Sequence, residues 1–329
     1  MKQILIERYG VPDEVARCAE VADVCQPAAD EVVFEVLATP INPADLAFCR
    51  GRYRVRPPLP AVPGAECVGR VTAVGAGVVK IQANDLVINL ETENWVARRR
   101  VRADDVVVLP PGIDLEQASM LRANPMTARL LLSDVVPLQR GEWVIQNVAN
   151  SAAGKHLIRL AAIRGIHTVN VVRRESVFDE LRALGADVCV IDGPNLAERV
   201  HAAIGGSPLR LAIDAVAGEA TARLSDCVAD GGTVCCYGSM IGADPSMRRS
   251  AVVYRGVSLV GFTLRRELQR YAAEEVRMVY DDLAQLVVDG TLRATVEARY
   301  SIDDIQAALR HAQQEGRSGK VLLLPNGNV

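Results

Sequence analysis

The chain has 329 residues, of which half are apolar and 23% are charged. This length suits two domains, and the composition is that of a globular protein rather than a disordered or fibrous one. The formal net charge of −3 gives no general reason to expect nucleic acid as a partner. No apolar run reaches the roughly 18–20 residues that span a bilayer, so we expect no membrane segment.

The opening segment, MKQILIERYG, lacks the apolar core of a secretory signal and has the pattern of a first strand. We therefore expect a cytoplasmic protein. The eight cysteines form no C-x-x-C pair and have no zinc-ligand spacing. They are expected to be free, buried thiols in a reducing compartment.

The first 110 residues are predicted to be rich in strands. Gly and Pro punctuate apolar or alternating segments there. These segments are EVVFEVLAT (31–39), ECVGRVTAVG (66–75) and DLVINL (85–90). A helical stretch begins at about Leu115, and the pattern of the sequence changes from that point.

From residue 142 the chain repeats an order of apolar strand, loop and helix. The expected strands are 142–149, 167–174, 187–192, 209–217, 233–238 and 257–263, with helices at 153–164, 176–185 and 196–205. Strands without alternation that are joined by helices predict a parallel sheet covered on both faces. This is the pattern of a doubly wound dinucleotide-binding domain.

The C-terminal part is predicted to return to the first domain. Two helical stretches (265–290 and 304–316) precede a last strand, KVLLLP, which can complete the sheet of the first domain. The predicted fold is therefore α/β, with a Rossmann-type domain over 116–263. It is inserted in a discontinuous, β-rich catalytic domain made of 1–115 and 264–329.

The turn after the first strand of the inserted domain is a degenerate glycine fingerprint. Ala149, Ser151 and Gly154 occupy its three small positions. Small residues let a backbone approach a pyrophosphate, and the following helix N-terminus supplies N–H donors. Tight packing of a strand on a helix would require small residues as well. His156, on that helix, is expected at the surface.

Arg173 and Arg174 stand about twenty residues further on, at the end of the second strand. An enzyme that uses NAD carries a carboxylate at this place for the ribose hydroxyls. A carboxylate would repel a 2′-phosphate, whereas a guanidinium binds it through paired hydrogen bonds. The position favours NADPH as cofactor over the alternative of two solvated arginines.

Several segments resemble the medium-chain dehydrogenase/reductase superfamily. They are INPADLAFCRGRYRVRPPLPAVPGAECVGRV, ANPMTARLLL, VIQNVANSAAGKHLIRLA and TVNVVRRES. Within the superfamily the sequence is most similar to the 2-enoyl thioester reductases, including the mitochondrial enoyl-acyl-carrier-protein reductases. The quinone oxidoreductases are near relatives. The resemblance implies a GroES-like catalytic domain and a reductase that uses NADPH.

The zinc ligands of the superfamily are missing at the matching positions. Zinc members carry a Cys early in the catalytic domain and a His before the Glu of a Gly-His-Glu segment. The matching stretches here are Ile41-Asn42-Pro43 and Gly64-Ala65-Glu66. We expect a metal-free enzyme, in which another group stabilises the charge on the substrate carbonyl.

The resemblance supplies Tyr53 as that group, since the matching tyrosine of the enoyl thioester reductases is assigned as proton donor. Hydride addition at Cβ of an enoyl thioester moves negative charge to the thioester oxygen. A phenol can donate a hydrogen bond to that oxygen and help deliver a proton to Cα. The alternative is a tyrosine that packs under a Pro-rich loop.

The same resemblance implies the cofactor-binding residues. They are Asn124, the turn residues Asn150, Ser151, Ala152 and Ala153, the two arginines Arg173 and Arg174, the segment Tyr237, Gly238, Ser239 and Met240, the segment Phe262, Thr263 and Leu264, and Lys320. Ala152 and Ala153 replace the usual Gly-Val pair, and Arg174 replaces an acidic residue.

Two groups of arginines have open interpretations. The run Arg98–Arg100 with Arg102 could attract phosphates or an acidic acyl-carrier protein, but charge runs are usually solvated faces. Arg52, Arg54 and Arg56, beside Tyr53, are placed for the phosphates of a pantetheine or nucleotide, or are solvated.

The leading hypothesis is a reductase of 2-enoyl thioesters carried on coenzyme A or acyl-carrier protein. The first alternative is an NADPH:quinone or general enone reductase. The second is a protein that binds NADPH without catalysis, against which Tyr53 argues. The apolar segment GVSLVGFTL (256–264) ends the predicted sheet, and an unpaired apolar edge predicts a homodimer.

Overall fold

The computed structural model describes residues 1–53 and 56–327. It divides into two compact units: Met1–Ala123 with Ala273–Val329 (unit 1), and Asn124–Ala272 (unit 2). Both divisions lie eight or nine residues beyond the predicted boundaries. Residues 116–123 stay in unit 1 because the side chain of Gln117 bonds the backbone of Ala294. Residues 264–272 stay in unit 2, where Tyr271 donates to Asp134.

Unit 2 is built on a six-stranded parallel sheet, in the order β10-β9-β8-β11-β12-β13. The strands are β8 (Trp143–Asn147), β9 (His167–Val172), β10 (Val188–Ile191), β11 (Leu209–Asp214), β12 (Thr233–Cys236) and β13 (Ser258–Gly261). Apolar strand interiors that face helices on both sides explain why these segments do not alternate.

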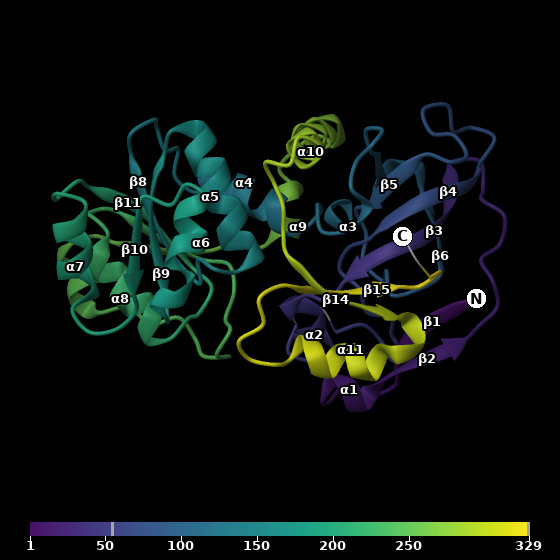
Figure 1. The fold of residues 1–329 in the computed structure, drawn as a ribbon, viewed down its shortest axis with the longest axis horizontal. Coiled ribbons are helices and arrows are strands. Elements are labelled where there is room, and N and C mark those ends of the chain that lie inside the picture. The colour runs from purple at the N-terminus through teal and green to yellow at the C-terminus, as the bar shows by residue number, and fades with distance from the viewer. Residues whose placement is uncertain (54–55, 328–329) are drawn as a thin grey trace. The chain divides into compact units, whose positions relative to one another are not determined.

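Helices cover both faces of this sheet (Figure 1). One cluster packs α5 (Ala152–Arg164) and α6 (Phe178–Ala183) on the sheet, with Ile158 and Leu181 buried. Another packs α7 (Leu196–Ala203) and α8 (Glu219–Cys227), with Val200 and Leu224 buried. The unit also contains α4 (Asn124–Ser133), the π-helix Ser250–Tyr254 and α9 (Leu264–Leu268). His156 is buried, so the expectation of a surface position was wrong.

Unit 1 contains a mixed sheet in the order β14-β15-β3-β4-β5-β7, with β6 paired to β3. Its strands are β3 (Glu31–Pro40), β4 (Val68–Val74), β5 (Leu86–Asn89), β6 (Arg98–Arg102), β7 (Val106–Val108), β14 (Val296–Ser301) and β15 (Lys320–Leu324). β15 pairs antiparallel with β3, which confirms that the last strand completes this sheet. β1 (Lys2–Ile6) and β2 (Ala16–Glu20) form a separate pair.

The helices of unit 1 are short, with one exception. They are α1 (Pro12–Val15), α2 (Pro43–Cys49), α3 (Leu115–Ala118), α10 (Ala273–Val288) and α11 (Ile305–Ala312). The predicted fold class is confirmed: a Rossmann-type parallel sheet lies within a chain whose two ends build a β-rich unit. No helix among the described residues is long and apolar enough to cross a membrane.

Candidate cofactor and substrate site

The carboxyl edge of the unit 2 sheet gathers most of the predicted cofactor residues. The chain places β9 and β10 on one side of β8, and β11, β12 and β13 on the other. In doubly wound sheets, ligands bind at the carboxyl ends of the strands where the strand order reverses, which here is between β8 and β11. The residues that follow these strands are 150–153 after β8, 173–174 after β9, 237–240 after β12 and 262–264 after β13.

The turn between β8 and α5 is shaped for close backbone approach. Val148 has a φ of 51°, and the side chain of Ser151 caps α5 by accepting from the N–H of Gly154 at 3.1 Å. A Cβ added to Gly154 would lie 2.6 Å from the carbonyl oxygen of Ala149. The helix of 13 residues therefore begins directly at the turn, and its positive end faces this edge.

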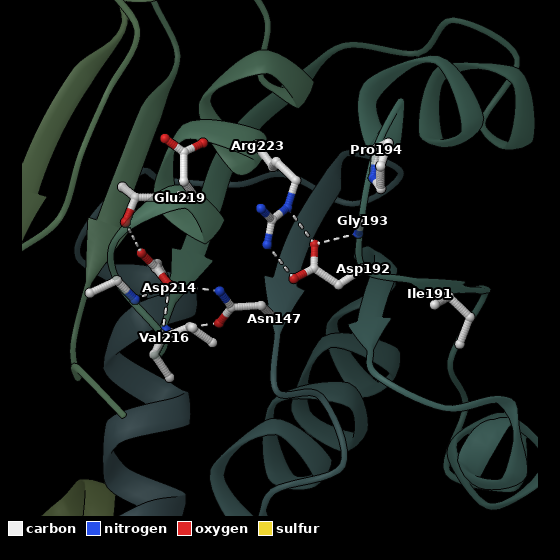
Figure 2. A network of polar contacts seen from close by, with 12 residues as sticks. Asn147, Ile191, Asp192, Gly193, Pro194, Asp214, Val216, Glu219 and Arg223 are labelled. Carbon is white, nitrogen blue, oxygen red and sulfur yellow. Dashed lines mark hydrogen bonds and ion pairs between the residues drawn. The ribbon is translucent and has the colours of Figure 1, made fainter. Parts of the chain in front are cut away.

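A buried carboxylate, Asp214, ties the two strands at the reversal together (Figure 2). One of its oxygens accepts from Asn147 Nδ2 at 2.6 Å and from the backbone N–H of Val216 at 2.8 Å. The other oxygen accepts from the Thr221 hydroxyl at 2.5 Å. Asn147 in turn accepts from the N–H of Ala215 at 2.8 Å. These bonds fix the ends of β8 and β11 and the start of α8.

The segment after β12 is held against the same strand end. The N–H of Tyr237 donates to the carbonyl of Asp214 at 2.9 Å, and that of Met240 donates to Ala215 at 2.9 Å. Burial raises the pKa of Tyr237 to about 12, and a hydrogen bond with Ser151 opposes this shift. Two of the predicted cofactor segments, 150–153 and 237–240, are thus in direct contact.

The third segment follows β13. Phe262 is buried and donates its N–H to Cys236 at 2.8 Å, Thr263 precedes α9, and Leu264 begins that helix. Gly238 and Ser239 lie between Tyr237 and the exposed Met240 side chain.

Arg173 and Arg174 are exposed, and no carboxylate among the described residues pairs with either guanidinium. Lys155, the cation in the first turn of α5, is instead paired with Glu180. The two arginines are therefore the uncompensated positive charges beside the turn, where a 2′-phosphate would be placed.

Asn124 has an unsatisfied donor, since its buried Nδ2 finds no partner within the described residues. A phosphorylated dinucleotide needs three features that occur here. They are an amide donor without a partner, a turn too tightly packed for a side chain at Gly154, and two arginines without carboxylate partners. The residues of unit 2 fit NADPH on this ground.

Tyr53 lies in unit 1, four residues after α2 ends, and its side chain is 44% exposed. No described residue hydrogen-bonds its hydroxyl. The preceding turn is fixed: Gly51 has a φ of +67°, and the N–H of Arg52 donates to Ala47 at 2.8 Å. Tyr53 is therefore not a tyrosine buried beneath the Pro-rich loop. Arg54 lies outside the described residues, and Arg56 is exposed.

The positions of the lost zinc ligands now belong to a network of hydrogen bonds around α2. Asp45 is buried, and its two oxygens accept from the N–H groups of Asn42 at 2.8 Å and Ala65 at 2.9 Å. Burial, and then the Glu66 carboxylate, raise the pKa of Asp45 to about 7, although its two backbone donors oppose this. No group of three metal-binding side chains occurs in the described part of the chain.

Lys320 begins β15 and directs its ammonium to Asn42 Oδ1. It is the one predicted cofactor residue of unit 1. Sequence reasoning named Asn42 only as the position of a missing ligand and Glu66 only as the neighbour of another, and it missed Asp45 and Asp214. Asp45 and Asp214 are each a single acid with apolar residues on both sides, which was the available signal.

The arginine run 98–102 is strand β6, and it is not an unpaired positive surface. Arg98 pairs with Asp23 and Glu35. The other three also have carboxylate partners: Arg99 with Glu93, Arg100 with Glu31, and Arg102 with Asp30 and Asp104. The pairing favours the interpretation of a solvated face.

Known proteins resemble this chain along nearly its whole length. Residues 28–105 match the family described as alcohol dehydrogenase GroES-like domain, and residues 184–323 match the zinc-binding dehydrogenases. The mitochondrial enoyl-[acyl-carrier-protein] reductase of Dictyostelium discoideum is 33% identical over 301 residues, 89% of this chain and 86% of that protein. The human protein of the same name is 31% identical over 96% of this chain and 87% of its own.

The chain belongs to the medium-chain dehydrogenase/reductase superfamily. The predicted family is thereby confirmed. A solved protein from Bacillus thuringiensis, provisionally assigned as an NADPH:quinone reductase, has a TM-score of 0.92 and 29% identity over 98% of both chains. A mutant form of enoyl thioester reductase from Candida tropicalis has the same fold, with a TM-score of 0.85 and 23% identity over 98% of this chain and 99% of its own.

The expectation of a cytoplasmic protein was wrong by this comparison. The enoyl reductases that match this medium-chain reductase are named as mitochondrial proteins in Dictyostelium, human and Arabidopsis alike. Composition and strand pattern describe the folded domains, and they contain no information on cellular address.

We predict that Asp45→Asn will flatten the pH dependence of stability between about pH 4 and 7. The folded-state pKa of about 7 lies above the ordinary 3.8, so the folded protein binds more protons in this interval and loses stability as the pH rises. Urea unfolding at several pH values measures this slope.

The matched control for Asp45→Asn is Asp289→Asn. The pKa of Asp289 is lowered by its bonds to Thr291, so its stabilising effect is already present above pH 4. This control should leave the slope unchanged. An unchanged slope in Asp45→Asn would show that Asp45 does not titrate in the interval.

Proposed function

We propose that this chain reduces the carbon–carbon double bond of a 2-enoyl thioester with NADPH, and that it acts in fatty acid metabolism. The observation that carries the proposal is the 33% identity to an enoyl-[acyl-carrier-protein] reductase over most of both chains. The exposed Tyr53 hydroxyl supports it, because it is free to meet a substrate. The substrate is an enoyl group on coenzyme A or acyl-carrier protein.

The chemistry divides between cofactor and protein. When bound, NADPH supplies a hydride for Cβ of the substrate. The residues after β8, β9 and β12 hold its phosphates and ribose: Asn150, Ser151, Ala152 and Ala153 by the turn, Arg173 and Arg174 by charge, and Tyr237 by its bond to Ser151.

Tyr53 completes the reduction. Its phenol donates a hydrogen bond to the thioester oxygen, on which negative charge develops, and then gives its proton to Cα, after which the phenolate takes a proton from water. The new C–H bonds at Cβ and Cα replace the double bond, so the atoms balance without a metal ion. Asn42 and Ala65 stand where zinc enzymes have ligands, and we propose that activity is independent of zinc.

A quinone or enone substrate is the second candidate. The likeness to the Bacillus protein, with a TM-score of 0.92, favours it. Quinones need no dedicated proton donor of this kind, because water protonates their product oxygens readily. The role of Tyr53 therefore separates the two candidates.

Replacement of Tyr53 by Phe should lower the turnover of crotonyl-coenzyme A by about a hundredfold to a thousandfold, the usual effect of losing one such donor. The ring is kept, so thermal unfolding and NADPH affinity should stay close to those of the wild type. Quinone reduction by the same variant should change much less. The measurement is NADPH oxidation, followed in the presence of a chelator.

Tyr271→Phe is the matched control, since its hydroxyl donates to Asp134 within unit 2. It removes the same atom and should leave turnover near that of the wild type. Wild-type turnover of crotonyl-coenzyme A by Tyr53→Phe would rule out the donor role, and a wild type active only on quinones would favour the second candidate.

Replacement of Arg173 by Ala should weaken NADPH binding by roughly 1–3 kcal/mol and leave NADH binding nearly unchanged. The reason is that only NADPH carries the 2′-phosphate. Arg182→Ala removes an equal charge from α6, where the arginine pairs with Asp179, and should change neither affinity. Fluorescence titration gives both dissociation constants. Equal affinity of the wild type for NADH and NADPH would contradict the assignment.

We also propose a homodimer joined through β13. This strand ends the sheet, and all four of its residues are exposed, including Leu259 and Val260. Val253 and Tyr254 of the neighbouring π-helix are exposed too. An apolar strand edge with unpaired backbone groups is satisfied when a second copy pairs with it.

Light scattering should give twice the chain mass of 35.4 kDa for the wild type at micromolar concentration. Leu259→Lys should shift the protein toward monomer, because it places a charge at the edge. Val79→Lys changes an exposed apolar residue of unit 1 and should remain dimeric. A monomeric wild type would refute the proposal.

A further inference from the structure

Glu66 is a fully buried carboxylate, and both of its oxygens are occupied. Oε1 accepts from Asn42 Nδ2 at 2.8 Å, and Oε2 accepts from the backbone N–H of Ala123 at 2.7 Å. The backbone carbonyl of Glu66 also accepts, from the Thr39 hydroxyl at 2.7 Å. A carboxylate out of water needs such partners. The two oxygens therefore connect Glu66 to two separate parts of the chain, Asn42 and Ala123.

The first oxygen determines the orientation of Asn42. With Nδ2 directed at Glu66, the amide oxygen of Asn42 turns to the ammonium of Lys320 and accepts from it. An amide rotated by half a turn would present a donor to the ammonium and an acceptor to the carboxylate, and both bonds would be lost. Glu66 therefore fixes Lys320 through one intermediate side chain.

The second oxygen holds the residue before Asn124. The residue before Ala123 is also fixed: the side chain of Arg122 donates hydrogen bonds to the carbonyls of Ala65 at 2.6 Å and Leu90 at 2.8 Å. Arg122, through its guanidinium, and Ala123, through the Glu66 carboxylate, are thus fixed one after the other. Asn124 follows directly, with its orphan amide donor.

Charge couples these groups as well. Burial raises the pKa of Glu66, and the Lys320 ammonium opposes this shift, followed by the hydrogen bond from Asn42. Burial lowers the pKa of Lys320, while Glu66 and Asp45 act in the opposite direction. Each ion therefore favours the charged form of the other.

We propose that Glu66 is a positioning residue for the cofactor: one oxygen fixes the ammonium of Lys320 through Asn42, and the other holds the segment that presents Asn124. Glu66 itself touches neither cofactor nor substrate. The inference rests on the proposed function and on the sequence resemblance, which implies that Lys320 and Asn124 contact NADPH. It differs from a purely structural role, in which Glu66 would stabilise unit 1 without effect on binding.

The experiment is a double-mutant cycle read by the dissociation constant of NADPH, measured by fluorescence titration of the full chain. Its variants are Glu66→Gln, Lys320→Met and the two together. Glu66→Gln keeps the size of the side chain but has a single oxygen, so one of the two donors loses its acceptor. Thermal unfolding of every variant shows which of them fold.

Glu66→Gln should raise the dissociation constant roughly tenfold, as expected for one lost hydrogen bond to a charged group. Lys320→Met should raise it by at least as much. In the double variant the two factors should not multiply, because the route through Lys320 has already been removed. The control Gln117→Met removes two buried hydrogen bonds to Ala294 and should lower the unfolding temperature only.

Two results would overturn the proposal: a dissociation constant unchanged in a folded Glu66→Gln, or factors that multiply fully in the double variant. If Glu66→Gln does not fold, Asn42→Ala takes its place in the cycle, since it removes the side chain that connects Glu66 to Lys320 and leaves Ala123 bonded to Glu66. An unchanged dissociation constant in Asn42→Ala, or factors that multiply fully with Lys320→Met, would then overturn the proposal.

The assay also separates this inference from the proposed reaction. A wild type that binds NADPH but does not reduce crotonyl-coenzyme A would contradict the reaction, while the binding cycle still tests Glu66. A wild type that reduces crotonyl-coenzyme A with no coupling in the cycle would contradict only the role of Glu66.

Discussion

The hydrogen bonds of the Asp214 carboxylate are the interaction on which the candidate cofactor site of unit 2 depends. A parallel sheet brings its strand ends to one edge, but it does not fix the loops that leave them. Asp214 does so, because its oxygens join the end of β8, the turn after β11 and the start of α8 (Figure 2). A buried carboxylate is tolerated only when its lone pairs are used, and here nearly all of them are.

A second carboxylate on the same edge is satisfied in another way. Asp192, after β10, receives two bonds from the guanidinium of Arg223 at 2.7 and 2.6 Å, so that α8 is fixed to both sides of the sheet reversal (Figure 2). Since Asp192 and Asp214 are both neutralised or fully bonded, neither competes with a phosphate for Arg173 and Arg174. The guanidinium groups of Arg173 and Arg174 at this edge of the sheet therefore remain available to bind an anionic ligand.

Unit 1 shows how a superfamily member without the zinc ligands satisfies the acidic residues at that place. Removal of a metal ion from a site that keeps Asp45 and Glu66 would leave two buried carboxylates close together, which is unfavourable. The ammonium of Lys320 supplies the compensating charge, and Asn42 connects it to Glu66. Lys320 begins the last strand, β15, and the sequence resemblance predicts that it contacts the cofactor.

The sequence alone determined the parallel sheet, the inserted order of the domains and the family. Continuous apolar strands and small-residue turns carry that information locally, and the structure confirms them. The sequence did not predict strand β6 (Arg98–Arg102), because only Val101 of its five residues is buried and the segment has no apolar pattern. Its pairing with β3 forms only in the folded chain. β14 was not predicted either, although its less exposed and more exposed residues alternate as in a strand.

The candidate site likewise contains residues that the sequence predicted and residues that only the folded structure identifies. The phosphate turn, Arg173, Arg174, Tyr53 and Lys320 were predicted because each belongs to a short motif. The roles of Glu66 and Asp214 were not predicted, since the sequence around a single acid in an apolar segment does not indicate which residues will bond to it. Asn42, Ala123 and Lys320 lie 24, 57 and 254 residues from Glu66. Only the tertiary structure decides such contacts, because burial without water is what forces these distant groups to satisfy one another.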